Sequence, residues 1–476
     1  MPSNIQATRA KKGSIMKLFS FREISILIAS FIALIGLKFG CQNYPSKALN
    51  NQRGAIVENQ TSPETEDNES GNPASDKTDK ETGNGSSAGN GSKSESDNND
   101  IDEDLDKEIE KIGVISPKQL TGIWLTNVDS KVLYSKETIE RAVARSKEFG
   151  VNAVYPVIWN KEEIFLKSKV VEKEFGSEFI ASPDDMDVLK QVTLAAARQG
   201  LATAAWYENG LKVPIKFENG EYFKLGKLFE EKNWLMKDKN GRNHTDCEFS
   251  VCKGFLSPFH PEVQKFFIDF FTEVASYPGL YGVMIDDHFS INPDFGYDKE
   301  TQDRYKAYRT QKNLSDTTSN FNRFRTEAVV DLIAKLKAAV NAKGKKFILS
   351  PGGTPSWSRV RWLLDWRAVI DQNAADEIIM QSYRYNLPAF KNLLAESQVR
   401  NAALKIKFSV AVLMGLLNNR QSSGKLIHDQ TSHALSLGYG VSYFYYDTID
   451  IHAKDVESPE ARKTWHEKTT KLLKGI

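Results

Sequence analysis

The fold is decided by the stretch Tyr281-Gly-Val-Met-Ile-Asp-Asp-His-Phe289. Its apolar first half has the length and composition of a buried strand. The strand stops on two adjacent carboxylates, Asp286 and Asp287, followed by His288. Because ionised side chains are rarely buried without a partner, the strand is expected to end in a polar cleft. The competing interpretation is that one Asp caps the next turn or helix while the other is solvated.

This stretch is one of eight strand-like segments that alternate with helical segments from residue 116 onward. The alternation is typical of parallel βα units. The expected strands are residues 120–126, 152–159, 201–207, 281–285, 346–350, 377–383, 406–412 and 440–446. The expected helices are residues 137–149, 186–198, 261–274, 321–342, 361–370, 389–400, 424–436 and 460–473.

Eight strand–helix units predict a (β/α)8 barrel of the TIM type, in which active sites lie at the C-terminal ends of the strands. A doubly wound open sheet is the competing fold. None of the expected strands is followed by a Gly-rich phosphate fingerprint, which argues against the nucleotide-binding forms of that sheet. A long insertion, from about residue 209 to residue 280, follows the third strand. Loops of this kind build the active sites of barrels.

The composition of the 476-residue chain narrows the class of protein. Its 63 basic and 62 acidic residues nearly cancel, and the sequence has neither a basic cluster nor a zinc-type Cys/His spacing. We therefore expect no nucleic-acid partner, no metal and no other cofactor. Aromatic residues make up 11% of the chain. Several fall at predicted strand ends, where their flat apolar faces suit a sugar-binding cleft as well as they suit a core.

The N-terminus has the pattern of an export signal. A positive flank, residues 16–22, precedes the mostly apolar run 24–37. That run is short for a membrane span and right for the core of a signal peptide. It ends at Gly40-Cys41, which resembles a bacterial lipoprotein cleavage site with Cys41 as the lipidated residue, although Lys38 stands where that site prefers an aliphatic side chain. A plain secretory signal or an uncleaved anchor is the alternative.

The sequence therefore divides into three predicted regions. Residues 1–41 are predicted to be a signal peptide or lipoprotein anchor, residues 42–115 a disordered linker, and residues 116–476 the barrel domain. The linker is rich in Ser, Asn, Asp, Glu and Gly, so it cannot bury enough apolar surface to offset its ordering entropy. The barrel would then be tethered to a membrane only through its N-terminal anchor, in the periplasm or at the surface of a bacterium. The oligomeric state stays open.

The two cysteines of the predicted domain lie close together in the sequence. Cys247 and Cys252 are separated by Glu-Phe-Ser-Val. In an oxidising compartment they can close a small disulfide loop. The alternative is two free thiols.

A barrel brings the C-terminal ends of its strands to one rim, so the residues there are the candidates for the site. They combine carboxylates, amides and aromatic rings, which suit glycoside hydrolysis. The catalytic candidates are Glu208, Asp286 and Asp287. The candidates for substrate binding are Trp124, Asn127, Trp159, Asn160, Trp206, Tyr207, His288, Gln381, Tyr383, Arg384, Tyr446 and Asp447.

In glycoside hydrolysis one carboxylic acid protonates the leaving oxygen, while a second carboxylate attacks the sugar or activates water. The Gly-x-x-x-Asp spacing that starts at Gly282 places Asp286 inward, as nucleophile or charge stabiliser, with Glu208 as the general acid/base. Asp287 is expected to orient a sugar hydroxyl or to pair with Arg384. The seventh strand lacks a terminal carboxylate, which excludes the common arrangement with Glu on strands four and seven.

Each candidate also has a structural explanation. Glu208 can simply open an Asn-Gly turn, and the Trp residues can fill the upper core. His288 is as well suited to hydrogen-bond a neighbouring group as to carry a proton. Arg384 and Asp447 can form a structural ion pair. A metal site built from the Asp-Asp-His run is disfavoured, because adjacent residues point in different directions.

With these residues laid out, the chain resembles the glycosyl hydrolase-like 10 family, a group of bacterial barrel proteins often described as family 10 glycosylhydrolases. The resemblance runs from about Leu120 to the C-terminus. It rests on the blocks 122–129 (GIWLTNVD), 152–160 (NAVYPVIWN), 205–208 (AWYE), 257–264 (SPFHPEVQ), 282–289 (GVMIDDHF), 295–297 (FGY) and 381–384 (QSYR).

The resemblance implies a (β/α)8 barrel that acts on glycans of the bacterial envelope or its surroundings, peptidoglycan sugar strands among them. The Asp-Asp block of the family maps to Asp286 and Asp287, and the carboxylate after the Trp of the third strand maps to Glu208. The chain departs from the family at Pro351-Gly-Gly-Thr-Pro355, where a more amide-rich loop is expected. A second departure surrounds the cysteine pair. Both departures bear on the choice of substrate.

The predicted function is therefore that of an exported glycoside hydrolase without a required cofactor, acting on a polysaccharide or oligosaccharide. One alternative is a non-catalytic glycan-binding or envelope-scaffold protein on the same barrel. The other is a metal-dependent hydrolase centred on the Asp-Asp-His run.

Overall fold

The computed structural model describes residues 95–248, 250–416 and 420–475. These residues belong to one compact unit. The predicted signal or anchor segment 1–41, with its lipidation candidate Cys41, and residues 42–94 of the predicted linker lie outside the described residues. Within the described ranges, no helix is both long enough and apolar enough to cross a membrane.

Eight parallel strands close into a barrel, as the sequence predicts. Each strand pairs with the next, and the last pairs with the first through Tyr443 and Ile123. The strands of the barrel are β1 (Gly122–Leu125), β2 (Ala153–Asn160), β4 (Ala202–Tyr207), β7 (Gly282–Asp286), β8 (Lys346–Ser350), β9 (Glu377–Gln381), β10 (Lys407–Leu413) and β11 (Gly440–Phe444). The closure confirms the (β/α)8 barrel and excludes the open sheet.

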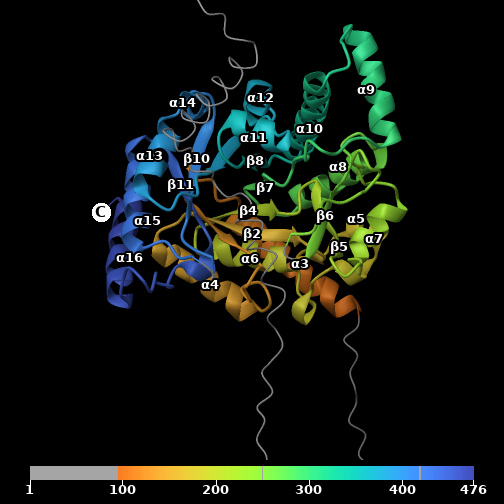
Figure 1. Ribbon diagram of the computed structural model, residues 1–476. Coiled ribbons are helices and arrows are strands. Elements are labelled where there is room, and N and C mark those ends of the chain that lie inside the picture. The colour runs from red at the N-terminus through yellow and green to blue at the C-terminus, as the bar shows by residue number, and fades with distance from the viewer. Residues whose placement is uncertain (1–94, 249, 417–419, 476) are drawn as a thin grey trace, which may run out of the picture. The chain divides into compact units, whose positions relative to one another are not determined.

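Helices surround the barrel (Figure 1). Those that follow the barrel strands are α4 (Lys136–Phe149), α6 (Val188–Arg198), α8 (Pro261–Ala275), α10 (Thr318–Asn341), α11 (Pro355–Trp362), α12 (Trp366–Asp371), α13 (Leu387–Ala395), α14 (Ser397–Ala403), α15 (Gly424–Ser436) and α16 (Pro459–Lys474). Their ends are readable in the sequence: Ser135 and Thr138 form a capping box at the start of α4, and Gly150 ends that helix in the left-handed conformation.

One helix that was predicted to be continuous is interrupted in the structure. Residues 361–370 were expected to form a single helix, but the structure divides this region between α11 and α12. Leu363 adopts a left-handed conformation with φ of 50°, which ends α11. Asp365 then accepts a hydrogen bond from the Ala368 amide and caps α12.

Shorter elements decorate the connections. They are β3 (Glu163–Ile164), which pairs antiparallel with the end of β2, the helices α5 (Lys169–Phe175) and α9 (Lys299–Lys312), and the 3₁₀ helices η2 (Ser177–Phe179), η3 (Pro183–Asp185) and η4 (Tyr446–Thr448). In Figure 1, α9 stands out at the edge of the barrel domain, next to α10.

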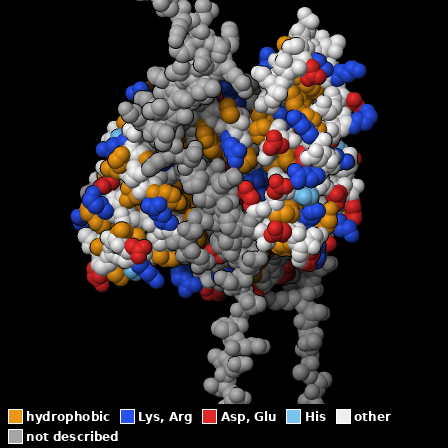
Figure 2. Space-filling view, in the orientation of Figure 1, with side chains coloured by type: hydrophobic (Ala, Val, Ile, Leu, Met, Phe, Trp, Pro, Cys, Tyr) orange, Lys and Arg blue, Asp and Glu red, His pale blue; other side chains and the backbone are white. Residues whose placement is uncertain are grey.

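The long insertion after β4 forms a small sheet beside the barrel. β5 (Lys212–Phe217) and β6 (Val251–Phe255) pair antiparallel, with α7 (Lys224–Glu231) between them in the chain. Cys247 and Cys252 form a disulfide at the start of β6. Figure 2 shows charged side chains of both signs gathered on the part of this face that holds the insertion. The insertion therefore presents charged side chains on its outer surface.

The prediction of a disordered linker is wrong for its C-terminal part. Residues 42–115 were expected to be disordered, but α3 (Glu95–Ile112) is a helix that packs against α6. Ile109 is fully buried at this contact. Arg198 donates both its Nε and an Nη hydrogen to the carboxylate of Glu108, at 2.7 Å each. An acidic residue of the segment that was predicted to be disordered, Glu108, thus pairs with a basic residue in the last turn of α6, Arg198.

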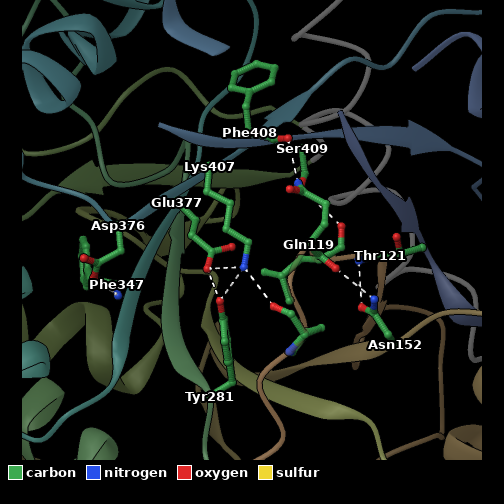
Figure 3. A network of polar contacts seen from close by, with 12 residues as sticks. Gln119, Thr121, Asn152, Tyr281, Phe347, Asp376, Glu377, Lys407, Phe408 and Ser409 are labelled. Carbon is green, nitrogen blue, oxygen red and sulfur yellow. Dashed lines mark hydrogen bonds and ion pairs between the residues drawn. The ribbon is translucent and has the colours of Figure 1, made fainter. Parts of the chain in front are cut away.

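The N-terminal ends of the barrel strands are closed by a polar network (Figure 3). Tyr281 and Lys407 both donate hydrogen bonds to the Glu377 carboxylate, the lysine at 3.0 Å. Lys407 also contacts the Pro117 carbonyl at 3.2 Å. These residues lie at or just before the first residues of β7, β9 and β10, and in the segment that leads into β1. Since barrel active sites lie at the opposite end, we assign this network to stability.

Candidate active site

Asp286 ends β7 and faces the interior of the barrel. Its neighbour in the sheet is β4, where Trp206 is in register with Met284. Side chains alternate along a strand, so Trp206, Met284 and Asp286 share the inner face. The Trp206 indole donates to Asp286 Oδ2 at 3.1 Å, and the His288 amide donates to Oδ1 at 2.9 Å. Asp286 is 2% exposed, so it is a buried carboxylate held by two N–H donors.

Glu208 follows β4 and is joined to the Asp-Asp-His run by backbone contacts. The amides of Leu211 and Lys212 donate to the His288 carbonyl at 3.0 and 3.2 Å. Gly210 makes this close approach possible, because a Cβ there would lie 2.1 Å from the His288 carbonyl carbon. The turn that follows Glu208 is therefore both a structural turn and the device that brings this loop against β7.

His288 links two of the three catalytic candidates, Glu208 and Asp286. Its Nδ1 lies 2.9 Å from the Glu208 carbonyl and 3.7 Å from Asp286 Oδ1. A carbonyl only accepts, so Nδ1 carries the proton in this contact. His288 thus bridges the Glu208 backbone and the Asp286 carboxylate at one end of the barrel.

Asp287 has a different environment. Gln381 at the end of β9 donates its Nε2 to Asp287 Oδ1 at 2.6 Å and to the Ser350 carbonyl at 3.1 Å. The glutamine thus ties Asp287 to β8 and β9, in place of the predicted pairing with Arg384. Gly352 lies beside the same carboxylate, since a Cβ there would be 3.5 Å from Asp287 Oδ2. Asp287 is only partly buried, which leaves part of its surface accessible.

A cavity of about 210 Å³ opens between the barrel rim and the insertion. Its lining combines one carboxylate with lysines, amides and apolar side chains. The lining residues are Val128, Asn160, Lys161, Glu208, Asn209, Lys212, Pro214, Phe223, Val251, Lys253 and His288. Glu208 and His288 therefore face a space in which a sugar unit can lie.

Of the two predicted amides, Asn160 lines this cavity, and Asn127 does not line it but hydrogen-bonds to Asn160. Asn160 Nδ2 donates to Asn127 Oδ1 at 2.9 Å. Asn127 Nδ2 donates to Glu163 Oε2 at 2.7 Å, and the Tyr134 hydroxyl donates to the same carboxylate. The chain of bonds fixes which end of each amide is donor and which is acceptor.

The comparison with known protein families bears directly on this barrel. The model of the family described as Glycosyl hydrolase-like 10 matches residues 119–432, which is more than half of the chain. The chain belongs to the glycosyl hydrolase-like 10 family. The match covers Glu208, Asp286 and Asp287, so the family resemblance expected from the sequence is confirmed. No curated protein matches the chain.

Solved structures similar to this glycosyl hydrolase-like 10 chain include several glycoside hydrolases. The PgaB (BpsB) glycoside hydrolase domain from Bordetella bronchiseptica is 12% identical, with a TM-score of 0.51 over 73% of this chain and 98% of that one. The catalytic domain of beta-amylase from Paenibacillus polymyxa is 11% identical, with a TM-score of 0.49 over 75% of this chain and 100% of that one. At this level of identity, the similarity to the Bordetella domain shows a shared fold.

Two aromatic candidates of this family member lie outside the cavity. Trp159 and Tyr207 were predicted to bind substrate, but each is 1% exposed. Both rings pack edge-to-face against Phe270 of α8, at 5.4 and 6.0 Å between centroids. A β-bulge between Val157 and Trp159 reverses the facing of the strand end, so Trp159 points to the helices and the next residue points inward. These two rings belong to the hydrophobic layer between barrel and helix.

Three other aromatic candidates form a buried cluster inside the barrel. Trp124, Trp206 and Tyr383 are 2%, 1% and 1% exposed. Phe444 lies 6.0, 6.4 and 5.8 Å from their ring centroids. The prediction that they stack on sugar is not supported by this burial. The cluster contributes to the site through Trp206, whose indole hydrogen-bonds to Asp286.

Two further candidates, Tyr446 and Asp447, were expected at the end of the last strand but lie in η4, which follows β11. Tyr446 is partly buried, and burial raises the pKa of its hydroxyl, while the charges of Arg141 and Arg145 act in the opposite direction. Asp447 lies beside Ser130 and Asp129, and burial raises the pKa of its carboxyl to about 6. Neither residue lines the cavity.

Arg384 completes the predicted set. Its Nη1 donates to the Tyr383 carbonyl at 3.0 Å, and its own carbonyl accepts from Gln430 of α15. The second of these bonds ties the loop after β9 to a neighbouring helix. The side chain is partly buried, and it does not line the cavity.

Sequence reasoning missed the lysines of the cavity. Lys161 directly follows Asn160, while Lys212 and Lys253 lie in the insertion. Lys161 could have been predicted from the sequence, because it directly follows Asn160, a candidate at the end of a predicted strand. Lys212 and Lys253 could not, because the way a long loop packs against a barrel rim is a tertiary property. Among the described residues, no cluster of His, Cys, Asp and Glu has the geometry of a metal site.

Proposed function

We propose that this protein is an exported glycoside hydrolase that cleaves glycosidic bonds in an envelope or extracellular polysaccharide. One observation carries the proposal: Glu208 and Asp286 are brought to the same end of the barrel through His288, and Glu208 lines a cavity there. Membership of the glycosyl hydrolase-like 10 family supports it. A peptidoglycan glycan strand is one substrate that fits this proposal.

The environments of the two carboxyl groups support different roles. Asp286 accepts two N–H bonds, which fix the orientation of its carboxyl group and suit a nucleophile or a stabiliser of the cationic sugar. Glu208 faces the cavity and is the group placed to protonate a leaving oxygen. Asp287, held by Gln381, is placed to accept a hydrogen bond from a sugar hydroxyl. Retaining or inverting chemistry would show in the anomer released.

The location is part of the proposal. The apolar run at residues 24–37 and the Gly40-Cys41 pair support export with a lipid tether. The disulfide between Cys247 and Cys252 supports an oxidising compartment, since such bonds are rare in a reducing cytosol.

A second candidate function is glycan binding without hydrolysis. The observation in its favour is the burial of Asp286, which is 2% exposed and does not line the cavity. In this alternative the two N–H donors simply satisfy a buried carboxylate that supports the rim.

Product analysis separates the two functions. Purified protein is incubated with peptidoglycan and with exopolysaccharide, and new reducing ends are counted and identified by mass spectrometry. We expect reducing ends to be released even after exhaustive chelation of metals. Glu208→Gln and Asp286→Asn should each lower this release by at least about 100-fold. The exposed Glu218→Gln serves as the matched control and should be unchanged. Release that both active-site variants leave intact would refute the assignment, and binding without any release would favour the second function.

A further inference from the structure

A second hollow opens at the rim of the barrel. It has a volume of about 630 Å³ and is lined by the loop that follows β7 and by the helix α11, which follows β8. Because both segments follow the C-terminal ends of barrel strands, the hollow lies at the same end of the barrel as the candidate active site. Its lining includes Asn292, Asp294, Ser356, Trp357, Val360 and Arg361.

Two adjacent glycines connect this hollow to the candidate active site. A Cβ on Gly352 would lie 3.5 Å from Asp287 Oδ2, and a Cβ on Gly353 would lie 2.8 Å from Cε3 of the Trp357 ring. The second distance is too short for a real Cβ, so a glycine is needed for the ring to lie against the loop. The loop after β8 therefore has the Asp287 carboxylate beside one glycine and the Trp357 ring beside the next.

Trp357 differs from the other partly exposed tryptophans of the described residues. The Trp362 ring has the guanidinium of Arg361 at 5.0 Å from its centroid, and the Trp465 ring has the ammonium of Lys468 at 4.0 Å. Among the residues that the structure describes, Trp357 has neither a cation nor another aromatic ring packed on it. Its indole is therefore a flat apolar surface on which the C–H face of a sugar ring can stack.

The helix α11 presents three of the lining residues together. Trp357, Val360 and Arg361 are spaced i, i+3 and i+4, so they lie on one face of the helix. Val360 is 69% exposed, and contact with a ligand would remove this apolar surface from water. Thr354 caps the helix by accepting a hydrogen bond from the Trp357 amide at 3.4 Å. The indole thus has an apolar neighbour and a guanidinium on the same helix face.

The loop after β7 adds polar groups to the opposite side of the hollow. Asn292 Oδ1 accepts a hydrogen bond from the Asp294 amide at 2.9 Å. The Asn292 Nδ2 group makes no hydrogen bond to any described residue, so it remains a donor for a ligand. Asp294 and Arg361 supply one charge of each sign. A sugar hydroxyl both donates and accepts hydrogen bonds, so these groups together suit an uncharged sugar.

The two sides of the hollow are held in place by the fold. The Ile291 amide donates to the Trp362 carbonyl at 3.0 Å, which joins the loop after β7 to the end of α11. Arg325 of α10 is fully buried and donates its Nη1 to the Pro293 carbonyl at 2.8 Å. A loop and a helix that are fixed in this way lose little freedom when a ligand binds.

We propose that the hollow beside Trp357 is a second sugar subsite, which takes an uncharged unit of the same glycan that lies beside Glu208. Trp357 and Val360 contact the face of the sugar ring, and Asn292 donates to a hydroxyl. The inference deepens the proposed hydrolase function, on which it rests, by naming the substrate as a linear glycan of several units. Binding at Trp357 does not depend on cleavage.

Ligand length tests the subsite. The full chain with Glu208→Gln is titrated calorimetrically with chitooligosaccharides and with cello-oligosaccharides of two to eight units. In at least one series, we expect the affinity to rise about tenfold or more once the ligand is long enough to reach Trp357, and then to level off. The same affinity at every length in both series, or no binding in either, would overturn the subsite.

Tryptophan variants locate the gain with length. Trp357→Ala should remove it, which is a loss of about tenfold for the longest ligands, because the stacking surface is lost. Trp357→Phe keeps a ring and should keep most of the gain, which guards against a folding defect. Trp465→Ala removes another partly exposed indole, on α16, and is the matched control. A gain that survives in Trp357→Ala, or that Trp465→Ala removes equally, would contradict the proposal.

The outcome is separable from that of the proposed hydrolysis. Length-dependent binding that requires Trp357, with no cleavage by the native chain, leaves the subsite standing and removes the hydrolase. Cleavage with a KM that depends neither on the length of the glycan nor on Trp357 does the reverse.

Discussion

The Trp206 indole donates a hydrogen bond to the buried carboxylate of Asp286, at 3.1 Å. The bond joins the inner faces of β4 and β7 and fixes the carboxylate that the proposed mechanism uses. Hydrogen bonds to charged groups contribute about 1.5–3 kcal/mol. Trp206→Phe keeps a ring in the buried cluster but removes the donor. We expect kcat to fall by about 10- to 100-fold, measured as glycan release, with a small loss of thermal stability.

A second indole gives the control for this variant. Trp234 is 1% exposed and donates to Glu262 at 3.1 Å, away from the cavity lining. Trp234→Phe should therefore lower the melting temperature without changing kcat. If both variants lower kcat equally, the bond to Asp286 has no special part in catalysis.

His288 supports the second prediction. Its Nδ1 hydrogen holds the Glu208 carbonyl at 2.9 Å, so the ring positions the loop that carries the proposed acid/base. His288→Ala should lower kcat by about tenfold or more, because Glu208 loses its fixed position. His288→Asn, whose amide nitrogen can replace Nδ1 as donor, should recover part of that loss. His433→Ala on α15 is the comparison. An asparagine variant as impaired as the alanine variant would argue for a proton-carrying ring instead.

The barrel could be predicted from the sequence because each strand is a short apolar run bounded by turn residues. Asp286 was placed inward correctly, since alternation along an uninterrupted strand carries from Gly282 to its end. The same rule failed for Trp159. The bulge after Val157 shifts the alternation by one residue, and the local mark of it is Pro156, since a proline inside a central strand is typical of a bulge.

The composition of the site was less predictable than its position. Glu208 and Asp286 follow strands, so a barrel must bring them to one rim. Lys212 and Lys253 are in a loop of about 70 residues whose packing depends on contacts such as that of Gly210 with His288. The helix α3 was missed for a related reason, because the partner of Glu108 is an arginine 90 residues away.

The opposite end of the barrel supports a prediction about stability alone. Glu377 is 3% exposed, and burial raises its pKa while Tyr281 and Lys407 hydrogen-bond its carboxylate. Lys407→Met would leave this charge buried without its cation. We expect a loss of about 3 kcal/mol in the free energy of unfolding, measured by urea denaturation.

The double variant Glu377→Gln/Lys407→Met tests the cause of that loss. It removes both charges and keeps an acceptor for Tyr281, so most of the stability should return. Glycan release per folded molecule should match the native chain in both variants, because the network lies at the N-terminal ends of the strands. A double variant as unstable as the single one would show that packing of the lysine stem, and not its charge, is what matters.

The final prediction concerns pH and uses two carboxyl groups close together in the chain. Burial raises the pKa of Asp447 from 3.8 to about 6. Between these pH values the folded chain binds a proton that the unfolded chain has released, so stability falls as pH rises from about 4 to 6. Asp447→Asn should therefore raise the melting temperature at pH 7, by an amount equivalent to at most about 3 kcal/mol before solvent screening, and make no difference near pH 4.

Asp450 provides a control of opposite sign. Its pKa is lowered, first by the hydrogen bond from Arg145, so its ionised form stabilises the fold above the usual pKa of an aspartate. That contribution is lost as pH falls through the lowered pKa of the folded state. Asp450→Asn should then lower the melting temperature at pH 7 and converge with the native chain in acid. Calorimetric melting curves at half-unit steps from pH 3 to pH 8 measure both variants. If Asp447→Asn is destabilising at pH 7, the carboxylate of Asp447 is compensated in the folded chain, and burial does not dominate its ionisation.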